Sequence, residues 1–455
     1  MKQALLKAQA KKKQFYAKMK QHEDSDDSDA SLTSDDEDEV SENMVYQWFN
    51  DNRYLCLKYL GRGTFCRVWM VYDIESHEFY AMKVQFPKYY EDSQDELKIN
   101  RLINNRQRDS RLIKLMNSFV YNNSEGKHTC FIYELMGGTL LDIFKAYEDD
   151  NIPMNLCKKL IKETFLSLAE LHSLGIIHTD LKPENIMIKK KNKNIVKIVE
   201  LLVPLKLTEV YQNIVNENLP EDYSDYNKIK RKKVKKRIKL RCYKKLSEFV
   251  SDKLKNIEDK DEIIDITECD IDDVVDESSN KLKDFDIDHL NLKIIDFGNA
   301  EHIGKRTQDE IMIRNYRPPE NIMNEYYDEK ADVWSMGCII YEIFTGDYLF
   351  EVDKNQKTIE KDREHLHQMF EILGKMPRHM ALECDFTEDL FDNKGRILKH
   401  KTCEYTSLEE ILKSDFDYSE KDAKNIDIYL RKVFAYDLKE RYSAIDAAND
   451  SWINN

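Results

Sequence analysis

Hydrophobic and polar residues follow a β-type pattern in the part of the chain that begins near Tyr46. Short apolar runs of this kind cover Tyr54 to Leu60, Val68 to Tyr72, Phe79 to Val84 and Thr129 to Leu135. A helical pattern from about Asp92 to Asn104 separates the third run from the fourth. The spacing therefore predicts a small β-rich unit with one helix over residues 45–136.

After Gly138 the pattern becomes largely helical. Between Lys158 and Leu174, apolar residues recur at helical spacing, at Leu160, Phe165, Leu168 and Leu171. Residues 137–195 and 291–455 are therefore expected to form a larger, mainly helical unit. The predicted fold class is α+β, with two lobes that are interrupted by a spacer at residues 196–290.

The spacer contains two blocks of opposite charge. A basic block begins at Lys228 and an acidic block runs from Asp259 to Glu277. Such blocks are usually solvated and mobile, so we predict a disordered insert. Its basic part is a nuclear import signal, an anchor for a cytoplasmic partner or only solvated charge. The globular pattern resumes at the apolar run Leu292 to Ile295, which leads directly into Asp296.

The N-terminal segment has the composition of a disordered tail. Residues Lys2 to Lys20 are basic, and Glu23 to Glu42 are acidic and rich in serine. Blocks of this kind cannot bury enough apolar surface to fold. We therefore predict a charged tail over residues 1–44. Its serines are either phosphorylation sites or part of a merely solvating segment.

The amino-acid composition excludes several classes of protein. The 455 residues are 41% apolar and 35% charged, with a formal net charge of −15. This charge argues against a nucleic-acid-binding surface over the whole chain and favours a basic partner or plain solubility. The nine cysteines form no C-x-x-C pair, so neither a disulfide framework nor a zinc site is indicated. No apolar run is long enough to span a membrane. We expect a monomeric protein of the cytoplasm and nucleus, without a direct nucleic-acid or membrane partner.

A glycine-containing segment lies between the first two β-type runs. It reads Gly61-Arg62-Gly63-Thr64-Phe65-Cys66-Arg67-Val68 and follows Leu60. A single G-x-G is weak evidence for a phosphate-binding loop, because glycine pairs occur in many turns. Here, however, the next strand carries Ala81 and Lys83 on one face, which places an amine beside a backbone cradle for phosphate. The alternative for Lys83 is an ordinary surface lysine in a strand.

Glu96 is the predicted partner of Lys83. In a helix it shares a face with Ile99 and Ile103, so this face should turn Glu96 inward. An ion pair would hold the Lys83 amine on the α- and β-phosphates of a nucleotide. Asp95 is the alternative acidic residue, but it lies off this face.

Two separated motifs supply the groups that phosphoryl transfer needs. The first runs from His178 to Asn185 and contains Asp180 and Lys182, and the second is Asp296-Phe297-Gly298. Asp180 is the candidate base for a substrate hydroxyl, and Lys182 can reach the transferred phosphate. Asn185 and Asp296 offer hard oxygen ligands for Mg²⁺. The spacer between the motifs must leave the fold and return without separating them.

An adenine site is expected between the lobes. Val68 and Ala81 would cover one face of the base. The connector from Tyr133 to Gly137 includes Glu134 and Met136, and it would present backbone groups to the edge of the base. ATP is therefore the predicted nucleotide.

The chain resembles the eukaryotic protein kinases from about Tyr54 to Trp452, apart from the spacer. The match extends to Asp332 and to Arg441, which in that family support the catalytic loop and pair with the residue matching Glu320. More narrowly, the chain resembles the SR-protein kinases, which phosphorylate serines of arginine-serine-rich splicing factors. The pieces that carry this resemblance are His178-Thr179-Asp180, Gly298-Asn299-Ala300, Arg314-Asn315-Tyr316-Arg317, Thr345 to Glu351 and Leu373 to Arg378. A large spacer between the two motifs is also typical of those enzymes.

The resemblance gives Thr179 a regulatory meaning. Kinases that are activated by phosphorylation mostly carry an arginine at this position, which binds a phosphate on the activation segment. Without that arginine the enzyme is expected to be active as made. Thr307 remains a candidate phosphosite.

Six residues match substrate-docking positions of the SR-protein kinases. The acidic residues that dock arginine-rich peptide in those enzymes are matched here by Asp347, Glu364 and Glu371. The alternative is that the glutamates lie on the solvated polar face of a helix, whose apolar face is formed by Leu366, Met369, Phe370 and Leu373. Three basic residues match positions that receive an already phosphorylated serine, and the alternative is structural salt bridging. These are Arg314, Arg317 and Arg363.

Some residues depart from the family pattern. Cys66 stands at the third glycine position, Phe297 stands where many SR-protein kinases carry leucine, and Pro318 precedes Pro319-Glu320 in place of alanine. The rival hypotheses are a related dual-specificity kinase directed at splicing factors and a pseudokinase scaffold. Deleting Val196 to Asp288 is expected to leave peptide phosphorylation mostly intact.

Overall fold

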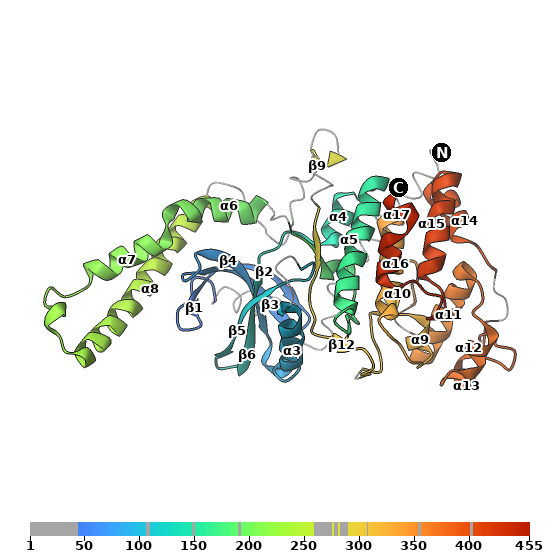
Figure 1. Ribbon diagram of the computed structural model, residues 1–455, viewed down its shortest axis with the longest axis horizontal. Coiled ribbons are helices and arrows are strands. Elements are labelled where there is room, and N and C mark those ends of the chain that lie inside the picture. The colour runs from blue at the N-terminus through green and yellow to red at the C-terminus, as the bar shows by residue number, and fades with distance from the viewer. Residues whose placement is uncertain are drawn as a thin grey trace.

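The computed structural model describes residues 44–105, 110–147, 151–189, 193–258, 275–276, 281–282, 290–306, 308–353, 356–400 and 404–455. The predicted N-terminal tail up to residue 43, Thr307 and the acidic block of the insert apart from residues 275–276 lie outside the described residues. The chain forms the two predicted lobes, a β-rich N-terminal lobe and a mainly helical C-terminal lobe (Figure 1). No helix of the described part is long and apolar enough to cross a membrane.

The N-terminal lobe is a six-stranded antiparallel sheet with the order β1-β2-β3-β4-β6-β5. Its strands are β1 (Trp48–Phe49), β2 (Tyr54–Gly63), β3 (Cys66–Asp73), β4 (Glu78–Gln85), β5 (Leu115–Asn122) and β6 (Lys127–Glu134). The helix α3 spans Asp92–Asn104, the predicted range. Strand β5 was not predicted, because its apolar residues do not alternate cleanly and Met116 and Val120 are exposed at this edge of the sheet.

The C-terminal lobe packs around the buried helix α10 (Lys330–Thr345). Trp334 lies inside this core, and Gly337 allows close approach of Phe434, whose ring would lie 2.7 Å from an added Cβ. Arg441 donates two hydrogen bonds to buried Glu320 of α9 (2.7 and 2.9 Å), as the resemblance implied, and a third to the carbonyl of Lys330 at the start of α10 (3.0 Å). The other helices are α4 (Leu140–Ala146), α5 (Met154–His172), α9 (Pro319–Ile322), α11 (Thr358–Leu373), α12 (Arg378–Glu383), α13 (Thr387–Leu390), α14 (Leu408–Phe416), α15 (Glu420–Val433), α16 (Ala444–Asn449) and α17 (Ser451–Asn454).

Two short strand pairs bring the separated motifs together. Strand β8 (Ile186–Ile188) pairs antiparallel with β11 (Leu292–Ile294), and Ile188 lies opposite Leu292. The chain therefore leaves the lobe at the end of β8 and returns on the neighbouring strand. A second pair joins β7 (Ile176–Ile177) to β12 (Glu301–His302). These pairings explain how a hundred residues are inserted without separating the two motifs.

The prediction of a disordered insert is wrong for its first part. Three helices occupy it, namely α6 (Lys193–Leu202), α7 (Leu207–Glu217) and α8 (Lys228–Glu258). Helices α7 and α8 form an antiparallel hairpin that extends beyond the N-terminal sheet (Figure 1). A short strand pair, β9 (Val275–Asp276) with β10 (Lys281–Leu282), lies later in the insert.

The helices of the insert share an apolar cluster with the N-terminal sheet. Leu202, Leu246 and Val250 are at most 1% exposed, and the sheet contributes residues of β2, β3 and β4, including Leu55, Met70 and Phe79. The apolar residues of α8 recur at helical spacing among many lysines. The average composition of this helix therefore did not indicate that one of its faces is apolar and buried. Helices α6, α7 and α8 of the insert are consequently part of the folded N-terminal lobe.

Candidate active site

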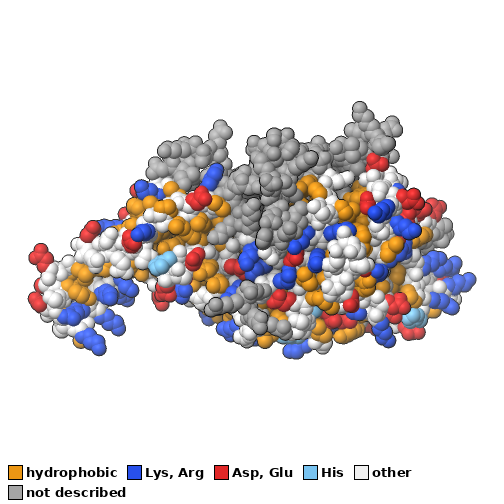
Figure 2. All heavy atoms as spheres, turned by 45° about the horizontal axis from the view of Figure 1, so that its top comes forward, with side chains coloured by type: hydrophobic (Ala, Val, Ile, Leu, Met, Phe, Trp, Pro, Cys, Tyr) orange, Lys and Arg blue, Asp and Glu red, His pale blue; other side chains and the backbone are white. Residues whose placement is uncertain are grey.

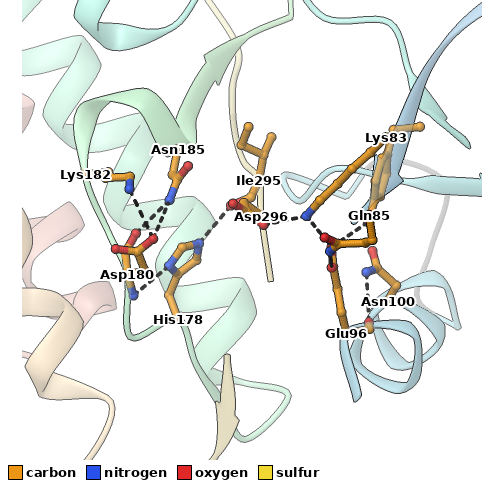
Figure 3. A network of polar contacts seen from close by, with 11 residues as sticks. Lys83, Gln85, Glu96, Asn100, His178, Asp180, Lys182, Asn185, Ile295 and Asp296 are labelled. Carbon is orange, nitrogen blue, oxygen red and sulfur yellow. Dashed lines mark hydrogen bonds and ion pairs between the residues drawn. The ribbon is translucent and has the colours of Figure 1, made fainter. Parts of the chain in front are cut away.

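Lys83 lies at the centre of a buried polar network between the lobes (Figure 3). Its Nζ donates to Oε1 of Glu96 at 2.8 Å and to Oδ1 of Asp296 at 2.7 Å. The three residues come from β4, α3 and the turn after β11, so the network joins segments more than two hundred residues apart. The ion pair that helical spacing predicted for Glu96 is present.

Glu96 is held by two further side chains. Gln85 donates its Nε2 to Oε2 of Glu96 at 2.7 Å, and the Tyr133 hydroxyl donates to Oε1 at 3.2 Å. Glu96 is 1% exposed, whereas the side chain of Asp95 is 75% exposed and pairs with Lys98. The structure therefore selects Glu96 over Asp95. Sequence reasoning missed Gln85, although its position two residues after Lys83 places it on the same face of the strand.

Charge in this network is shared between one ammonium and two carboxylates. Burial alone would lower the pKa of Lys83, but Asp296 and Glu96 outweigh it and hold that pKa well above its usual range. Burial would likewise raise the pKa of Asp296, yet Lys83 lowers it to about 2. Lys83 is thus charged and Asp296 is ionised at neutral pH, which suits phosphate binding and metal binding respectively.

The catalytic-loop residues converge on Asp180. Asn185 donates its Nδ2 to the Asp180 carbonyl at 2.8 Å, and Nζ of Lys182 lies 3.4 Å from Asp180 Oδ2. His178 donates from Nε2 to the Ile295 carbonyl at 2.8 Å and accepts the Asp180 N–H on Nδ1. His178 therefore connects the two predicted motifs directly, a role that sequence reasoning did not assign (Figure 3).

Burial and neighbouring charges act in opposite directions on Asp180. Burial raises its pKa above the usual range for aspartate, although the charge of Lys182 opposes this shift. A raised pKa makes the carboxylate a better proton acceptor, as a base for a serine hydroxyl requires. The pKa of Lys182 is also raised, because nearby carboxylates, first Asp180, outweigh its burial.

The loop backbone is anchored by the buried carboxylate of Asp332. Its Oδ2 accepts the His178 N–H at 2.8 Å, and its Oδ1 accepts the Thr179 N–H at 3.0 Å. Thr179 has a φ of +63°, which β-branched residues rarely adopt. The surrounding hydrogen bonds compensate for this strain and hold Asp180 in place.

Asn185 and Asp296 fit a magnesium ion. Asn185 uses its amide nitrogen within the loop, which leaves its amide oxygen for a metal, and Asp296 is ionised. The described residues contain no group of three or more His, Cys, Asp or Glu side chains that would bind a metal alone. Mg²⁺ commonly completes its coordination with phosphate oxygens and water, so this sparse donor set suits a nucleotide complex.

The glycine segment forms the hairpin between β2 and β3. Gly61 has a φ of +157° with open space beside it, and Thr64 and Phe65 occupy the turn. Cys66, at the third glycine position, is buried, which raises the pKa of its thiol to about 12. The turn itself is thus formed without a third glycine.

The remaining predicted nucleotide-binding residues flank this hairpin. Leu60, Val68 and Ala81 are partly exposed, and Val68 pairs with Lys83 across the β3–β4 ladder. The guanidinium groups of Arg62 and Arg67 lie 5.7 and 5.3 Å from the Phe86 ring, respectively.

The connector between the lobes leaves backbone donors available. Among the described residues, the N–H groups of Leu135 and Met136 donate to no backbone carbonyl. Glu134 accepts the Lys114 N–H at 2.9 Å and the Lys293 ammonium at 2.5 Å through its side chain. Its carboxylate therefore holds the connector against Lys114 and Lys293.

The chain matches a family of known proteins over most of its length. The family described as "Protein kinase domain" matches residues 54–208 and 278–453. The chain belongs to this family. It is therefore an ATP-dependent protein kinase, and the break in the match falls within the insert.

Relatives of this kinase narrow the resemblance. "Protein kinase dsk1" of Schizosaccharomyces pombe is 26% identical, over 89% of this chain and 81% of the relative. "Serine/threonine-protein kinase SRPK" of Physarum polycephalum is 27% identical, over 87% and 84%. "SRSF protein kinase 3" of Homo sapiens is 22% identical, over 89% and 87%. These relatives confirm the resemblance to the SR-protein kinases.

The predicted acidic docking residues of the kinase lie on and beside α11. Leu366, Met369 and Phe370 are buried as expected, and Glu364 and Glu371 are partly exposed. The loop after Asp347 is fastened to α11 by Gln368, which exchanges hydrogen bonds with the backbone of Glu351. The three predicted acids thus belong to two adjoining segments. Together with Glu351 of the same loop they form what we call the acidic surface (Asp347, Glu351, Glu364 and Glu371).

The three predicted basic docking residues have protein partners. Arg314 pairs with Asp362 at 2.5 Å, and Arg363 donates to the carbonyl of Asp389. Arg317 is 8% exposed and donates to the carbonyls of Ile311 and Met312. Structural bridging is therefore present, and a role as a phosphoserine receptor stays a prediction.

Proposed function

We propose that this kinase transfers the γ-phosphate of ATP to serines in arginine-serine-rich protein segments. The observation that carries this proposal is the acidic surface of α11 and the adjoining loop, because carboxylates form strong hydrogen bonds with guanidinium groups. The names of the relatives, including an SRSF protein kinase, support the same substrate class.

The proposed mechanism uses the groups around Asp180. Asp180 orients the serine hydroxyl and accepts its proton as the oxygen attacks the γ-phosphorus, and the bond between that phosphorus and the β–γ bridging oxygen breaks. Lys182 stabilises charge on the transferred group, and Lys83 holds the α- and β-phosphates. Asn185 and Asp296 would hold Mg²⁺, which supplies charge neutralisation on the phosphates.

The kinase is proposed to be active without phosphorylation of its activation segment. The ion pair between Lys83 and Glu96 is formed, and Phe297 is fully buried against His178 with ring centroids 5.8 Å apart. These features place Asp296 beside Lys83, as catalysis requires. They also favour an enzyme over a pseudokinase scaffold.

The substrate proposal is tested with two peptides and two triple variants. Purified kinase is expected to prefer an Arg-Ser repeat peptide over a proline-directed peptide. The triple variant Asp347→Asn, Glu364→Gln, Glu371→Gln should raise KM for the Arg-Ser peptide at least about tenfold, which corresponds to the loss of about 1.4 kcal/mol. The matched control replaces exposed acids outside the acidic surface, Asp417→Asn, Glu420→Gln and Glu440→Gln.

The outcomes separate the substrate classes. An unchanged KM in the first triple variant would remove the acidic surface from the proposal. A preference for the proline-directed peptide would instead favour the dual-specificity group. We further propose that the kinase is a monomer of the cytoplasm and nucleus, because its substrates are proposed to be splicing factors; imaging of the tagged full chain tests the location.

A further inference from the structure

The exposed face of α8 carries a dense array of positive charge. Twelve of the eighteen residues from Lys228 to Lys245 are Lys or Arg, and none is Asp or Glu. All twelve are exposed, while Ile238, Cys242 and Tyr243 are buried in the apolar cluster that α8 shares with the sheet. Figure 2 shows Lys and Arg side chains gathered at the outer end of the hairpin. We call these twelve side chains the basic face of α8.

Few of these charges are neutralised within the described part of the chain. Lys244 has a carboxylate within 4.0 Å, that of Glu248 at 3.9 Å, and Lys230 lies over the ring of Tyr226 at 3.4 Å. No other cation of the basic face forms an ion pair with a described residue. In a chain with a net charge of −15, so concentrated an array is suited to a polyanionic partner.

A segment of matching charge exists in the same chain. Eleven of the twenty residues from Glu23 to Glu42 are Asp or Glu, and none is Lys or Arg. Five serines are interspersed among these acids. Each phosphoserine would add about 1.5 to 2 negative charges and three acceptor oxygens, so modification would increase the complementarity. This segment lies outside the described residues.

The described chain begins directly beside α8. Trp48 in β1 donates from its indole Nε1 to the Tyr243 carbonyl at 3.1 Å and to Oγ of Ser247 at 2.9 Å. Its ring centroid lies 4.6 Å from that of Tyr243. Glu42 precedes Trp48 by only six residues. The acidic segment is therefore attached next to the C-terminal end of the basic face.

The acidic segment is long enough to follow the basic face. From Tyr243 back to Lys228, fifteen residues of helix span about 23 Å at 1.5 Å per residue. A chain of twenty residues reaches up to about 66 Å when it is fully extended. A short flexible tether gives an effective concentration of about a millimolar, which no free acidic protein would readily match.

We propose that the acidic segment Glu23 to Glu42 docks on the basic face of α8 in the same molecule. The contact is electrostatic and lies along the outside of the hairpin. It covers a cationic surface that would otherwise attract other polyanions. This proposal is independent of the substrate proposed above, because it uses none of the residues around Lys83 or the acidic surface.

Zero-length carbodiimide cross-linking of the full-length kinase tests the contact, because it joins carboxylates to lysine amines that touch. An equal mixture of ¹⁵N-labelled and unlabelled protein is cross-linked in about 50 mM and 500 mM salt, and the linked peptides are identified by mass spectrometry. Links from the acidic segment are expected to concentrate on lysines of α8, to join peptides of the same isotope, and to fall at least fivefold in the higher salt, where charges are screened.

Two charge-matched variants provide the controls. Lys232→Glu, Lys235→Glu and Lys239→Glu reverse one exposed side of α8, and links to the remaining α8 lysines should fall at least fivefold. Lys421→Glu, Lys424→Glu and Lys439→Glu reverse three exposed lysines of the C-terminal lobe, and the links to α8 should be unchanged. Links spread evenly over all surface lysines, or insensitive to the α8 variant, would overturn the proposal.

Other occupants of the basic face give different results. Links that join peptides of different isotopes would assign the contact to two copies of the chain and overturn docking within one molecule. Anisotropy titration of the kinase with a labelled twenty-nucleotide RNA provides a second readout. Micromolar binding that the α8 variant abolishes, together with absence of the tail links, would assign the face to nucleic acid and likewise overturn the proposal.

Discussion

The hydroxyl of Thr179 donates a hydrogen bond to the carbonyl of Asn299 at 2.6 Å. The Asn299 carbonyl also accepts from Nε2 of Gln308 at 2.8 Å. Thr179 thus connects the catalytic loop to the start of the activation segment without a phosphate group. In this kinase a neutral hydrogen bond stands at the position where kinases that are activated by phosphorylation mostly carry an arginine.

Replacing Thr179 tests this connection. Thr179→Val keeps the shape of the side chain but leaves the Asn299 carbonyl with one donor fewer, at a cost of about 1 to 2 kcal/mol. We expect kcat to fall about tenfold, measured with unphosphorylated enzyme. Thr179→Ser keeps the hydroxyl and should stay within about threefold of the parent. Equal activity of the valine and serine variants would contradict the proposed role.

The two neighbouring acids of α3 should differ sharply in function. Glu96→Gln removes the charge that faces Lys83 and is expected to lower kcat/KM for ATP about a hundredfold, since Lys83 then has Asp296 as its remaining carboxylate partner. Asp95→Asn breaks only an exposed ion pair with Lys98 and should change kcat/KM for ATP less than twofold. Steady-state kinetics at varied ATP concentration provides the measurement. Similar losses in both variants would refute the assignment.

Two histidines, His367 and His400, adjoin the acidic surface. His400 lies 3.7 Å from Glu364, and its ring centroid is 4.3 Å from that of His367. Burial, and next the charge of His367, lower the pKa of His400 below 6.5, so it is neutral at pH 7. As the pH falls through this lowered pKa, His400 gains a positive charge that competes with substrate arginine.

We therefore expect KM for the Arg-Ser peptide to rise severalfold between pH 7 and pH 5.5. The rise should be reduced in His400→Gln, which stays neutral over this range. Peptide KM measured against pH in the two proteins checks this. An identical rise in both would assign the effect to another group.

Docking of the insert should contribute to the stability of the N-terminal lobe. Leu246 is fully buried in the cluster shared with the sheet, and Leu246→Ala is expected to cost about 2 to 5 kcal/mol of unfolding free energy. Leu240 is 56% exposed, so Leu240→Ala should change the unfolding free energy by less than about 0.5 kcal/mol. Thermal unfolding with hydrogen exchange in β2 and β3 measures both.

The same cluster changes the expectation for a larger deletion. Removing residues 196–288 would expose Leu55, Met70 and Phe79 to water, so the deleted kinase should lose stability and with it activity. This outcome is opposite to what charge composition alone suggested. Full activity and an unchanged Tm of the deleted protein would show that the sheet tolerates exposure of this face.

Local patterns in the sequence predicted much of the fold and the site. The approximate range predicted for α3 agrees with the structure because its apolar residues keep helical spacing, and Glu96 could be chosen over Asp95 for the same reason. Lys83, Asp180 and Asp296 were identified because each stands in a short motif whose chemistry depends on adjacent residues. Such patterns are local, so they can be interpreted without knowledge of distant contacts.

Tertiary structure decided what depends on distant segments. Gln85 and Tyr133 were found to hold Glu96 only once three elements had met, and the insert proved to be folded because an apolar stripe of α8 finds the face of β2, β3 and β4. The sequence by itself determined the phosphoryl-transfer groups and the two lobes. Only tertiary packing decided that the lysine-rich helix α8 is anchored to the sheet, because burial of a few apolar side chains outweighs the average polarity of the helix that carries them.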